Sequence, residues 1–554
     1  MLLTLCVKPL GGYMARVFSG EPAWLSPIVS PLERIVYRIC RVDPAREMTW
    51  SAYACGLFGV SLCGAAFVYA VLRLQDRLPL NPQHFGAVGS LVAWNTAVSF
   101  LTTTDWQTYA GESTMSYLSQ MAALAWANFI AAAIGLAASV AFIRALVREK
   151  TDGLGNCWVD LTRACLYVLL PLAVAGCMAL AWQGIPQNFS AYVPAASLER
   201  GVQWITGGPM ASQEIIKLLG GNGGGFVAAN SASPNENPTG FSNLIELFVM
   251  LLIPAALTYT YGRMAGDRRQ GWAVYVAMSV LFVGGACLAT YAESAGNPLV
   301  HALGVQGPNM EGKETRFGAA GAGLSVAVAT ASTNGAANAT FESLTPLGTL
   351  VALANMQTSE VIYGGVGTGI LGMLLFVVLT VFIAGLMVGR TPEFLGKRIE
   401  RREITFVMLA VLTFPLAILF PAALAVLIPA GREPLGAAGP GGFSEVLYAF
   451  TSVTASNGSA FAGLGSNAFY DVATGIAMLA GRFGVLVPTL AVAGALARKP
   501  RNVIGKGTFS TSSPLFVVLL IGVVVVVGAL TFLPADALGP IVEHLLMIRG
   551  QASS

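Results

Sequence analysis

Apolar runs long enough to cross a lipid bilayer recur along the chain. A membrane-spanning helix needs about 20 predominantly apolar residues. Nine stretches meet this condition: residues 53–74, 118–147, 160–182, 242–262, 272–291, 368–388, 404–429, 468–495 and 514–534. The pattern predicts an all-α polytopic membrane protein.

The connections between these stretches alternate in charge. Five of them hold 22 of the 31 Lys and Arg residues: 8–50, 144–163, 263–269, 390–402 and 498–506. Positive charge accumulates on the cytoplasmic side of membrane proteins, so these five are predicted to be cytoplasmic. The remaining connections, and the tail after residue 535, are then external, which places the C-terminus outside.

The first 52 residues are interpreted separately. Met1–Val7 is apolar but too short to span, and Lys8 follows it, so it is interpreted as the stub of a truncated N-terminal helix. Between residues 28 and 39, apolar positions recur at helical spacing with arginines among them. This is typical of an amphipathic helix on the inner membrane surface, although a packed cytoplasmic loop explains the pattern equally well.

Composition agrees with a membrane protein. Hydrophobic residues make up 55% of the chain and charged residues 11%, whereas soluble domains carry about a quarter charged residues. All eight cysteines precede residue 288 and avoid the predicted external loops, which argues against a disulfide framework. The three histidines lie far apart, so the sequence predicts no metal-ligand cluster.

Four of the external connections share one design. Each holds a short helix-compatible stretch followed by a Gly, Thr, Ser and Asn cluster, at residues 95–107, 211–226, 325–335 and 444–458. The steps from Thr104 to Gly223, from there to Gly335 and from there to Gly458 are 119, 112 and 123 residues. A near-constant period with spans on both sides indicates an internal repeat of span, pore loop and span.

This repeat divides the chain. Residues 53–147, 160–262, 272–388 and 404–495 are predicted as repeats one to four. Residues 1–52 are the stub and the amphipathic segment, and residues 514–534 form a C-terminal transmembrane helix. The predicted architecture is four pseudo-repeats around one central axis.

Clusters of this composition suit a potassium ion. A K⁺ ion that sheds its water needs a ring of oxygens, and backbone carbonyls supply them without full charges. Glycine allows the backbone angles that turn successive carbonyls towards one axis. Hydroxyls of Thr103, Thr104, Ser332, Thr333 and Ser456 can add oxygens, while Asn222, Asn334 and Asn457 can tie the loops to their neighbours.

A plainer reading exists for each cluster taken alone, because Gly and Asn in an external loop usually mark a turn. Recurrence in register with the spans favours a filter. Asp105 and Glu112 follow the first cluster, where carboxylates would attract cations to an outer mouth; a solvated loop charge is the plainer interpretation of Glu112.

Two further features lie at membrane depth. Arg482 falls inside the span 468–495, where an unpaired arginine is costly, so a functional or gating role is favoured over an incidental one. Four glycines, Gly364, Gly365, Gly367 and Gly369, lie at the edge of the outgoing helix of the third repeat. They should break that helix, and they fit a gate or close helix packing equally well.

No catalytic residue is predicted. The run Gly307–Lys313 has phosphate-loop spacing, but Glu314 stands where Ser or Thr should follow and no strand precedes it. The sequence also contains no Asp-Lys-Thr-Gly motif and no cytoplasmic segment large enough for a nucleotide-binding domain. We therefore expect no nucleotide on this chain and no ATP hydrolysis by it alone.

Several stretches resemble the potassium-binding subunit (KdpA) of the Kdp potassium-transporting P-type ATPase. They are Asn95–Gln107, Leu219–Phe226, Asn309–Gly318, Gly385–Glu393, Gly442–Tyr448 and Asn457–Leu464. The resemblance runs from about residue 8 to the last span. The family normally has a complete N-terminal helix before the segment matching Lys8, Pro9 and Leu10, and here only seven residues precede it.

The resemblance implies a subunit of the bacterial inner membrane that works with a separate P-type ATPase subunit and two small accessory subunits. It implies no nucleic-acid partner. Matched residue by residue, the filter would comprise Thr103, Thr104, Asn222, Gly223, Gly224, Thr333, Asn334, Gly335, Ser456, Asn457 and Gly458, with Gln107 beside it. The control of exit would fall to Gly364, Gly365, Gly367, Gly369, Arg390 and Arg482.

Two other readings stay open at this point. An autonomous potassium channel or ion-coupled transporter of the same superfamily would share the four loops but need no ATPase partner. An inverted-repeat carrier for an organic solute would use broken helices at a midplane site, and it would show two matching halves rather than four.

Overall fold

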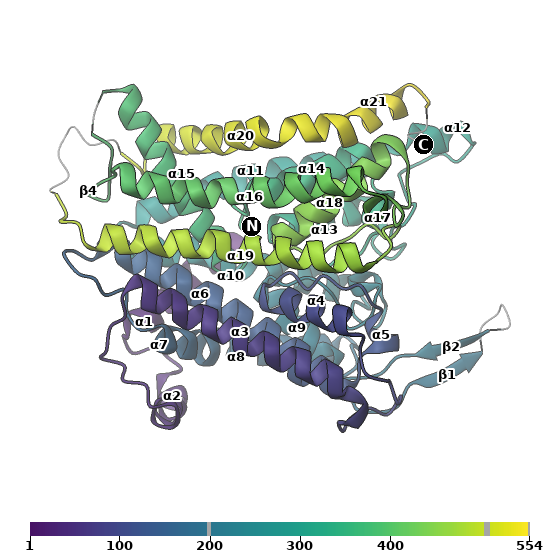
Figure 1. Cartoon of the computed structure of the whole chain (residues 1–554), viewed down its shortest axis with the longest axis horizontal. Coiled ribbons are helices and arrows are strands. Elements are labelled where there is room, and N and C mark those ends of the chain that lie inside the picture. Colours follow the sequence, from purple (N-terminus) through teal and green to yellow (C-terminus); the bar gives the residue numbers. More distant parts are fainter. Residues whose placement is uncertain (197–200, 390, 503–509, 552–554) are drawn as a thin grey trace.

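The computed structural model describes residues 1–196, 201–389, 391–502 and 510–551. Within them, nine helical stretches are long and apolar enough to span a membrane: Trp50–Arg77, Ser119–Val147, Cys157–Trp182, Gly240–Met264, Arg268–Ala302, Thr368–Met387, Arg401–Leu427, Ala468–Ala497 and Pro514–Ile548. Each coincides with a predicted span. In Figure 1 they run in roughly the same direction, along the long axis of the molecule.

The spanning elements have the following bounds: α3 Trp50–Leu74, α6 Trp126–Val147, α7 Cys157–Arg163 continuing into α8 Leu170–Trp182, α10 Gly240–Met264, α11 Arg268–Ala295, α15 Thr368–Met387, α16 Arg401–Leu427, α19 Ala468–Ala497 and α20 Pro514–Asp536. A π-helical turn, Ser119–Ala125, leads into α6, and another, Ala164–Leu169, joins α7 to α8.

Four short helices lie between pairs of spans. They are α4 Ser90–Leu101, α9 Met210–Gly220, α13 Gly318–Ala331 and α18 Gly439–Thr454. They lie between α3 and α6, α8 and α10, α11 and α15, and α16 and α19, respectively. The polytopic helical fold with four pore-loop units is therefore confirmed, and we call these four the pore helices.

The N-terminal helix is longer than its apolar start indicates. The prediction ended the stub at Val7, but α1 runs from Leu2 to Ser19, through Lys8 and Pro9. Contact with α10 holds this extension in place: Thr260 donates a hydrogen bond from Oγ1 to Gly11 O at 3.1 Å. Arg263 likewise donates from Nη1 to Gly12 O at 3.0 Å.

The outgoing helix of the third repeat is broken. The interval 292–367, predicted as an external connection, contains α14, Pro346–Gln357, which packs against α11, α13 and α18. Its 12 residues extend only about 18 Å, roughly half of a span. Residues 358–367 then run without regular helix before α15 begins. The sequence analysis missed α14 because the helix is short and contains polar residues, so it does not form an apolar run of spanning length.

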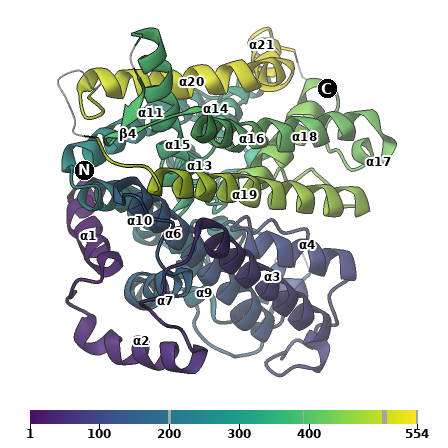
Figure 2. The same cartoon turned by 60° about the vertical axis from the view of Figure 1, so that its left-hand side comes forward.

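Helix α2, Ser26–Cys40, lies outside the bundle and crosses the direction of the spans (Figures 1 and 2). Glu33 ties it to the body by accepting hydrogen bonds from Tyr167 at 2.7 Å and Arg163 at 3.0 Å. Burial alone would raise the pKa of Glu33, but hydrogen bonds from Tyr37, Tyr167 and Arg163 outweigh it, and the net shift is downward. The predicted amphipathic helix is present.

Two small hairpins mark opposite ends of the bundle. Strands β1, Val193–Ala196, and β2, Val202–Ile205, pair antiparallel and project from the right-hand end in Figure 1. Strands β3, Glu393–Phe394, and β4, Lys397–Arg398, lie at the left-hand end. The remaining short helices include α5 Gly111–Thr114, α12 Pro298–Ala302, α17 Pro429–Arg432 and α21 Val542–Ile548.

Candidate ion-binding site

The same backbone turn ends all four pore helices. In each, one amide donates a hydrogen bond to the carbonyl five residues earlier: Thr104 to Ser99 at 3.0 Å, Asn222 to Lys217 at 3.1 Å, Asn334 to Ala329 at 2.9 Å and Asn457 to Ser452 at 2.9 Å. The preceding residue has a positive φ in every case: Thr103 66°, Gly221 64°, Thr333 51° and Ser456 53°. Four copies of one turn are strong evidence for the internal repeat.

This turn fixes which residues are equivalent, and it corrects the predicted register of the first loop. Thr104 aligns with Asn222, Asn334 and Asn457, not with the glycines that follow them. Asp105 therefore occupies the position that glycine holds in the other three loops. Thr104 and Asp105 stand where the third and fourth loops have an Asn-Gly pair. The first loop has no glycine here, so an alignment by residue type shifted it by one residue.

The four loops meet at one place. A Cβ atom built on Gly223 would lie less than 3.0 Å from the carbonyl oxygens of both Asn457 and Thr104. One built on Gly335 would approach Asn457 O as closely, and one on Gly458 would approach Thr104 O. Glycine is required at these positions because neighbouring loops place their carbonyl oxygens where a side chain would be.

A cavity of about 470 Å³ opens beside this meeting point. Each of the four loops contributes to its lining, through Asp105, Gly224, Gly335 and Gly458. The cavity lies beyond the ends of the four turns and is continuous with their glycine positions. It has the form of a vestibule that leads to the loops.

Side-chain amides tie the loops together. Asn457 donates from Nδ2 to Ala329 O at 3.0 Å and Asn334 donates to Lys217 O at 3.3 Å, so the fourth loop is fastened to the third and the third to the second. Gln107 donates to Gly225 O at 2.9 Å and accepts from its amide at 3.0 Å. Asn222 lies beside Asp105 of the first loop, but within the described residues its amide atoms have no hydrogen bond of good geometry.

The loop hydroxyls fall into two groups. Ser332 donates to Val328 O at 2.7 Å, and Thr104 shares a 3.0 Å hydrogen bond with Thr102 Oγ1, so both hydroxyls support the turns. The hydroxyls of Thr333 and Ser456 are buried and have no hydrogen-bond partner in the part of the chain that the structure describes. These two retain free oxygens for a ligand.

The two carboxylates of the first loop have different surroundings. Glu112 accepts a hydrogen bond from the Ala228 amide at 2.8 Å and fastens the first loop to the second. Asp105 is 1% exposed, and within the described residues neither of its carboxylate oxygens has a hydrogen bond of good geometry. Asn128 of α6 and Asn222 lie close enough to this carboxylate to interact with it. Asp105 is thus a buried acidic group that lines the vestibule.

A buried ionic cluster supports the second loop, and the sequence reading missed it. Lys217 of α9 contacts Glu214 at 2.7 Å and Glu236 at 3.5 Å, and it donates to Asn230 Oδ1 at 2.8 Å. Asn230 Nδ2 in turn donates to Gly224 O. Lys217 therefore reaches a carbonyl of the second loop through a single intermediate side chain. The available signal was one lysine and three glutamates within residues 214–246, next to the predicted second loop.

Replacing Lys217 with methionine should destabilise the protein by about 3–5 kcal/mol, because it leaves Glu214 and Glu236 buried without their cation. We expect a lower melting temperature of the purified protein and weaker K⁺ affinity, since Asn230 loses its partner. Adding Glu214→Gln should recover part of the loss. The exposed Lys150→Met serves as the matched control. An unchanged melting temperature would contradict a supporting role for the cluster.

A second, smaller cavity of about 20 Å³ lies on the other side of the loops. Arg482 of α19 lines it together with Glu360 and Thr368. The Arg482 guanidinium donates to Thr103 Oγ1 at 3.3 Å and to Ala131 O at 2.9 Å, while Thr368 donates to Glu360 at 2.6 Å. Arg482 thus joins the first loop to α6. Glu360, 6% exposed, was missed because it precedes the glycine run in an interval predicted to be external.

The glycine run breaks the helix and also packs closely. Gly364 and Gly367 have φ of 65° and 88°, and α15 begins only at Thr368. A Cβ on Gly367 would lie less than 3.0 Å from Gly135 O in α6. A Cβ on Gly365 would meet Thr333 Oγ1 at 2.6 Å, so the segment lies directly beneath the third loop. Arg390 lies outside the described residues.

The comparisons with known proteins agree on one family. Residues 1–545 match the family described as the potassium-transporting ATPase A subunit, KdpA. The chain is 54% identical over 551 residues to the potassium-transporting ATPase potassium-binding subunit of Mesorhizobium japonicum, covering 99% of this chain and 97% of that protein. It is 53% identical over 545 residues to the protein of the same description from Solibacter usitatus, covering 98% and 96%.

Among solved structures, the crystal structure of the potassium transporter TrkH from Vibrio parahaemolyticus is similar with a TM-score of 0.49 and 15% identity, covering 88% of this chain and 98% of that one.

Proposed function

Because this chain belongs to the family of potassium-transporting ATPase A subunits, we propose that its four pore loops form the seat in which a dehydrated K⁺ ion is held. The chain is a potassium-binding subunit of a multi-subunit potassium-transporting ATPase, and K⁺ is the transported ion. The autonomous channel is not favoured, since the relatives are named as ATPase subunits.

One observation carries the proposal. Carbonyl oxygens of Thr104 and Asn457 lie directly against Gly223, Gly335 and Gly458, so peptide oxygens from separate loops crowd around one point. A ring of carbonyls can replace the hydration shell of K⁺. The residues we assign to the filter are Thr103, Thr104, Gln107, Asn222, Gly223, Gly224, Thr333, Asn334, Gly335, Ser456, Asn457 and Gly458.

The pore helices add electrostatic support. Each of them ends at the meeting point, so their C-terminal ends, where the helix dipole is negative, surround the proposed ion. Irregular backbone at membrane depth is tolerated where it lines a cavity, and the 470 Å³ vestibule meets that condition. Asp105 contributes a carboxylate beside the entry.

We propose that K⁺ leaves the binding site past the broken segment 358–367. Gly364, Gly365 and Gly367 let this segment fold beneath the third loop, and Gly369 in α15 lets it pack closely on that helix. Arg482 places a positive charge next to Glu360 in the lower cavity. A cation leaving the loops must pass this charge. We propose that the segment and Arg482 together control passage, with Arg390 in the same region of the chain.

We also propose that this chain works in a larger membrane complex. A separate P-type subunit would hydrolyse ATP, two small subunits would complete the complex, and the site of action would be the bacterial inner membrane with the C-terminus outside. The basic end of the bundle, which carries β3 and β4, would then face the cytoplasm, and K⁺ would enter from the vestibule side.

The test is K⁺ uptake in bacterial cells that lack their other uptake systems. Expression together with the ATPase and small subunits is expected to restore growth and ATP-dependent uptake at micromolar K⁺, and the chain should co-purify with them. The chain expressed alone should give no uptake. Uptake by the chain alone, independent of ATP, would contradict the proposal and support a channel.

A further inference from the structure

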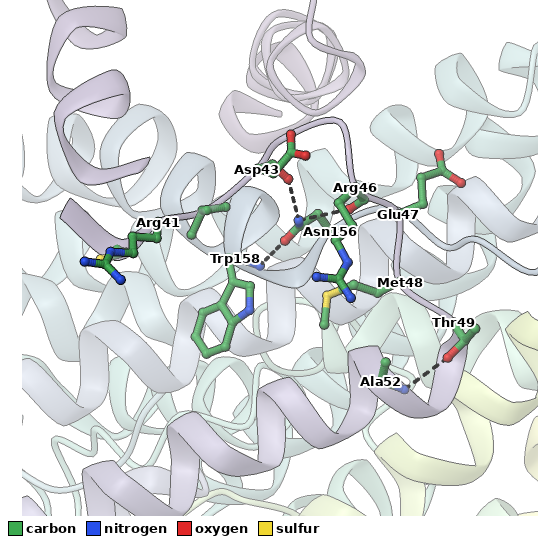
Figure 3. Close-up of a pocket in the computed structure, with 11 residues that line it drawn as sticks. Arg41, Asp43, Arg46, Glu47, Met48, Thr49, Ala52, Asn156 and Trp158 are labelled. Atoms are coloured by element: carbon green, nitrogen blue, oxygen red, sulfur yellow. Dashed lines mark hydrogen bonds between the residues drawn. The ribbon is translucent and has the colours of Figure 1, made fainter. Parts of the chain in front are cut away.

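A groove of about 730 Å³ lies between the C-terminal end of α2 and the first turns of two spans (Figure 3). Its lining includes Arg41 and Arg46 on the segment after α2, Met48 before α3, and Asn156 and Trp158 at the start of α7. In Figure 3 the indole of Trp158 is drawn between the two arginine side chains. The groove is remote from the pore loops, and ion binding does not account for it.

The two arginines are the available charges in this groove. Neither Arg41 nor Arg46 forms an ion pair within the part of the chain that the structure describes. Glu47, which also lines the groove, is neutralised by Arg148 at 2.6 Å. The remaining acidic residue, Asp43, accepts a hydrogen bond from the Ala45 amide at 3.0 Å, and its carboxylate points away from the Arg46 guanidinium in Figure 3.

The polar groups around them are already satisfied. Asn156 donates to the carbonyls of Asp43 at 3.1 Å and Arg46 at 3.0 Å, and it accepts from the Trp158 amide at 3.0 Å. Thr49 caps α3 through the Ala52 amide. The backbone of the groove is therefore fixed, while the two guanidinium groups remain free to bind an anion.

We expect the groove to lie at the level where lipid tails meet headgroups, because it is at the ends of two spans. The spans Trp50–Arg77 and Cys157–Trp182 both begin at its wall. Trp158 is 41% exposed, and partly exposed tryptophan is typical of membrane interfaces. Helix α2 next to it carries an exposed apolar stripe formed by Ile28, Leu32, Ile35 and Ile39, as an interfacial helix does.

We propose that this groove binds an anionic phospholipid from the leaflet at the basic end of the bundle. The phosphate would be held between Arg41 and Arg46, because guanidinium groups bind phosphate oxygens in a bidentate manner. The acyl chains would extend from Trp158 along the apolar stripe of α2. The two arginines would attract the negative phosphate, and the apolar stripe of α2 would contact the acyl chains. A free anion lacks acyl chains, so the groove should favour a lipid.

The test uses the purified whole complex with phosphatidylglycerol and phosphatidylcholine of matched acyl chains, and native mass spectrometry to measure bound lipid. The wild type should retain phosphatidylglycerol in preference to phosphatidylcholine. Arg41→Gln with Arg46→Gln should lower its occupancy at subsaturating lipid about 30-fold, because two arginines near a membrane surface are lost. Both residues are exposed, so folding should persist.

The matched control is Arg268→Gln with Arg269→Gln, which removes the same charge from the exposed first turn of α11 at the basic end of the bundle and should leave occupancy unchanged. Trp158→Ala should also reduce retention, and excess inorganic phosphate should not displace the lipid. Equal retention by the groove variant, equal loss in the control, or displacement by inorganic phosphate would each overturn the proposal.

Discussion

Replacing Gly223 with alanine is expected to abolish uptake at micromolar K⁺. The new methyl group would lie less than 3.0 Å from two carbonyl oxygens, Asn457 O and Thr104 O, and both belong to other pore loops. Neither oxygen can move without displacing its own turn. The loops must separate, and the spacing that replaces the water around K⁺ is lost.

We expect the apparent KM for K⁺ in whole-cell uptake to rise by at least about 100-fold, which corresponds to about 2.7 kcal/mol of lost binding. Gly223→Asp should be more severe, because it adds volume and charge. Gly86→Ala is the matched control, since a Cβ there has no atom within 4 Å. Wild-type uptake by Gly223→Ala at micromolar K⁺ would contradict the filter assignment.

Replacing Arg482 with glutamine is expected to uncouple the subunit without collapsing the filter. The guanidinium lies beneath the first loop, bonded to Thr103 Oγ1 and Ala131 O, and it is 4% exposed. At an effective dielectric constant of about 20, a positive charge about 8 Å away raises the free energy of a cation by on the order of 2 kcal/mol. Arg482 would have this effect on a cation in the lower cavity. Its removal should ease passive passage.

The measurement is K⁺ flux in proteoliposomes that contain the whole complex. Without ATP, Arg482→Gln should leak K⁺ about 30-fold faster than the wild type, and ATP-driven accumulation should fall. Arg482→Lys keeps the charge and should restrict the leak, so it separates charge from shape. A glutamine variant that neither leaks nor loses coupling would show that Arg482 is structural only.

Prediction from the sequence succeeded for features that are encoded in consecutive residues. Nine spans followed from apolar runs because a bilayer imposes one length on every helix that crosses it. The four pore loops followed from a repeat of about the same length, and the family followed from extended matching stretches. These features do not depend on which residues meet in space.

Prediction was less successful where a side chain or a turn decided the outcome. Thr104 was aligned with Gly223, one residue out of register, because only the hydrogen bond from Thr104 to Ser99 reveals the equivalent position. Helix α14 was missed because 12 residues with polar side chains do not resemble a span. The cluster around Lys217 was missed because Glu236 becomes its neighbour only through folding of the second loop, although Glu214 lies one helical turn away in α9.

The amino-acid order thus determined the number of spans, the four loops and the family, since hydrophobic length and local composition act along the chain. Tertiary structure alone decided which carbonyl faces which glycine. The physical reason is that these contacts join loops more than 100 residues apart, such as Gly223 and Asn457, and short-range hydrogen bonds and steric exclusion operate only after the loops have met.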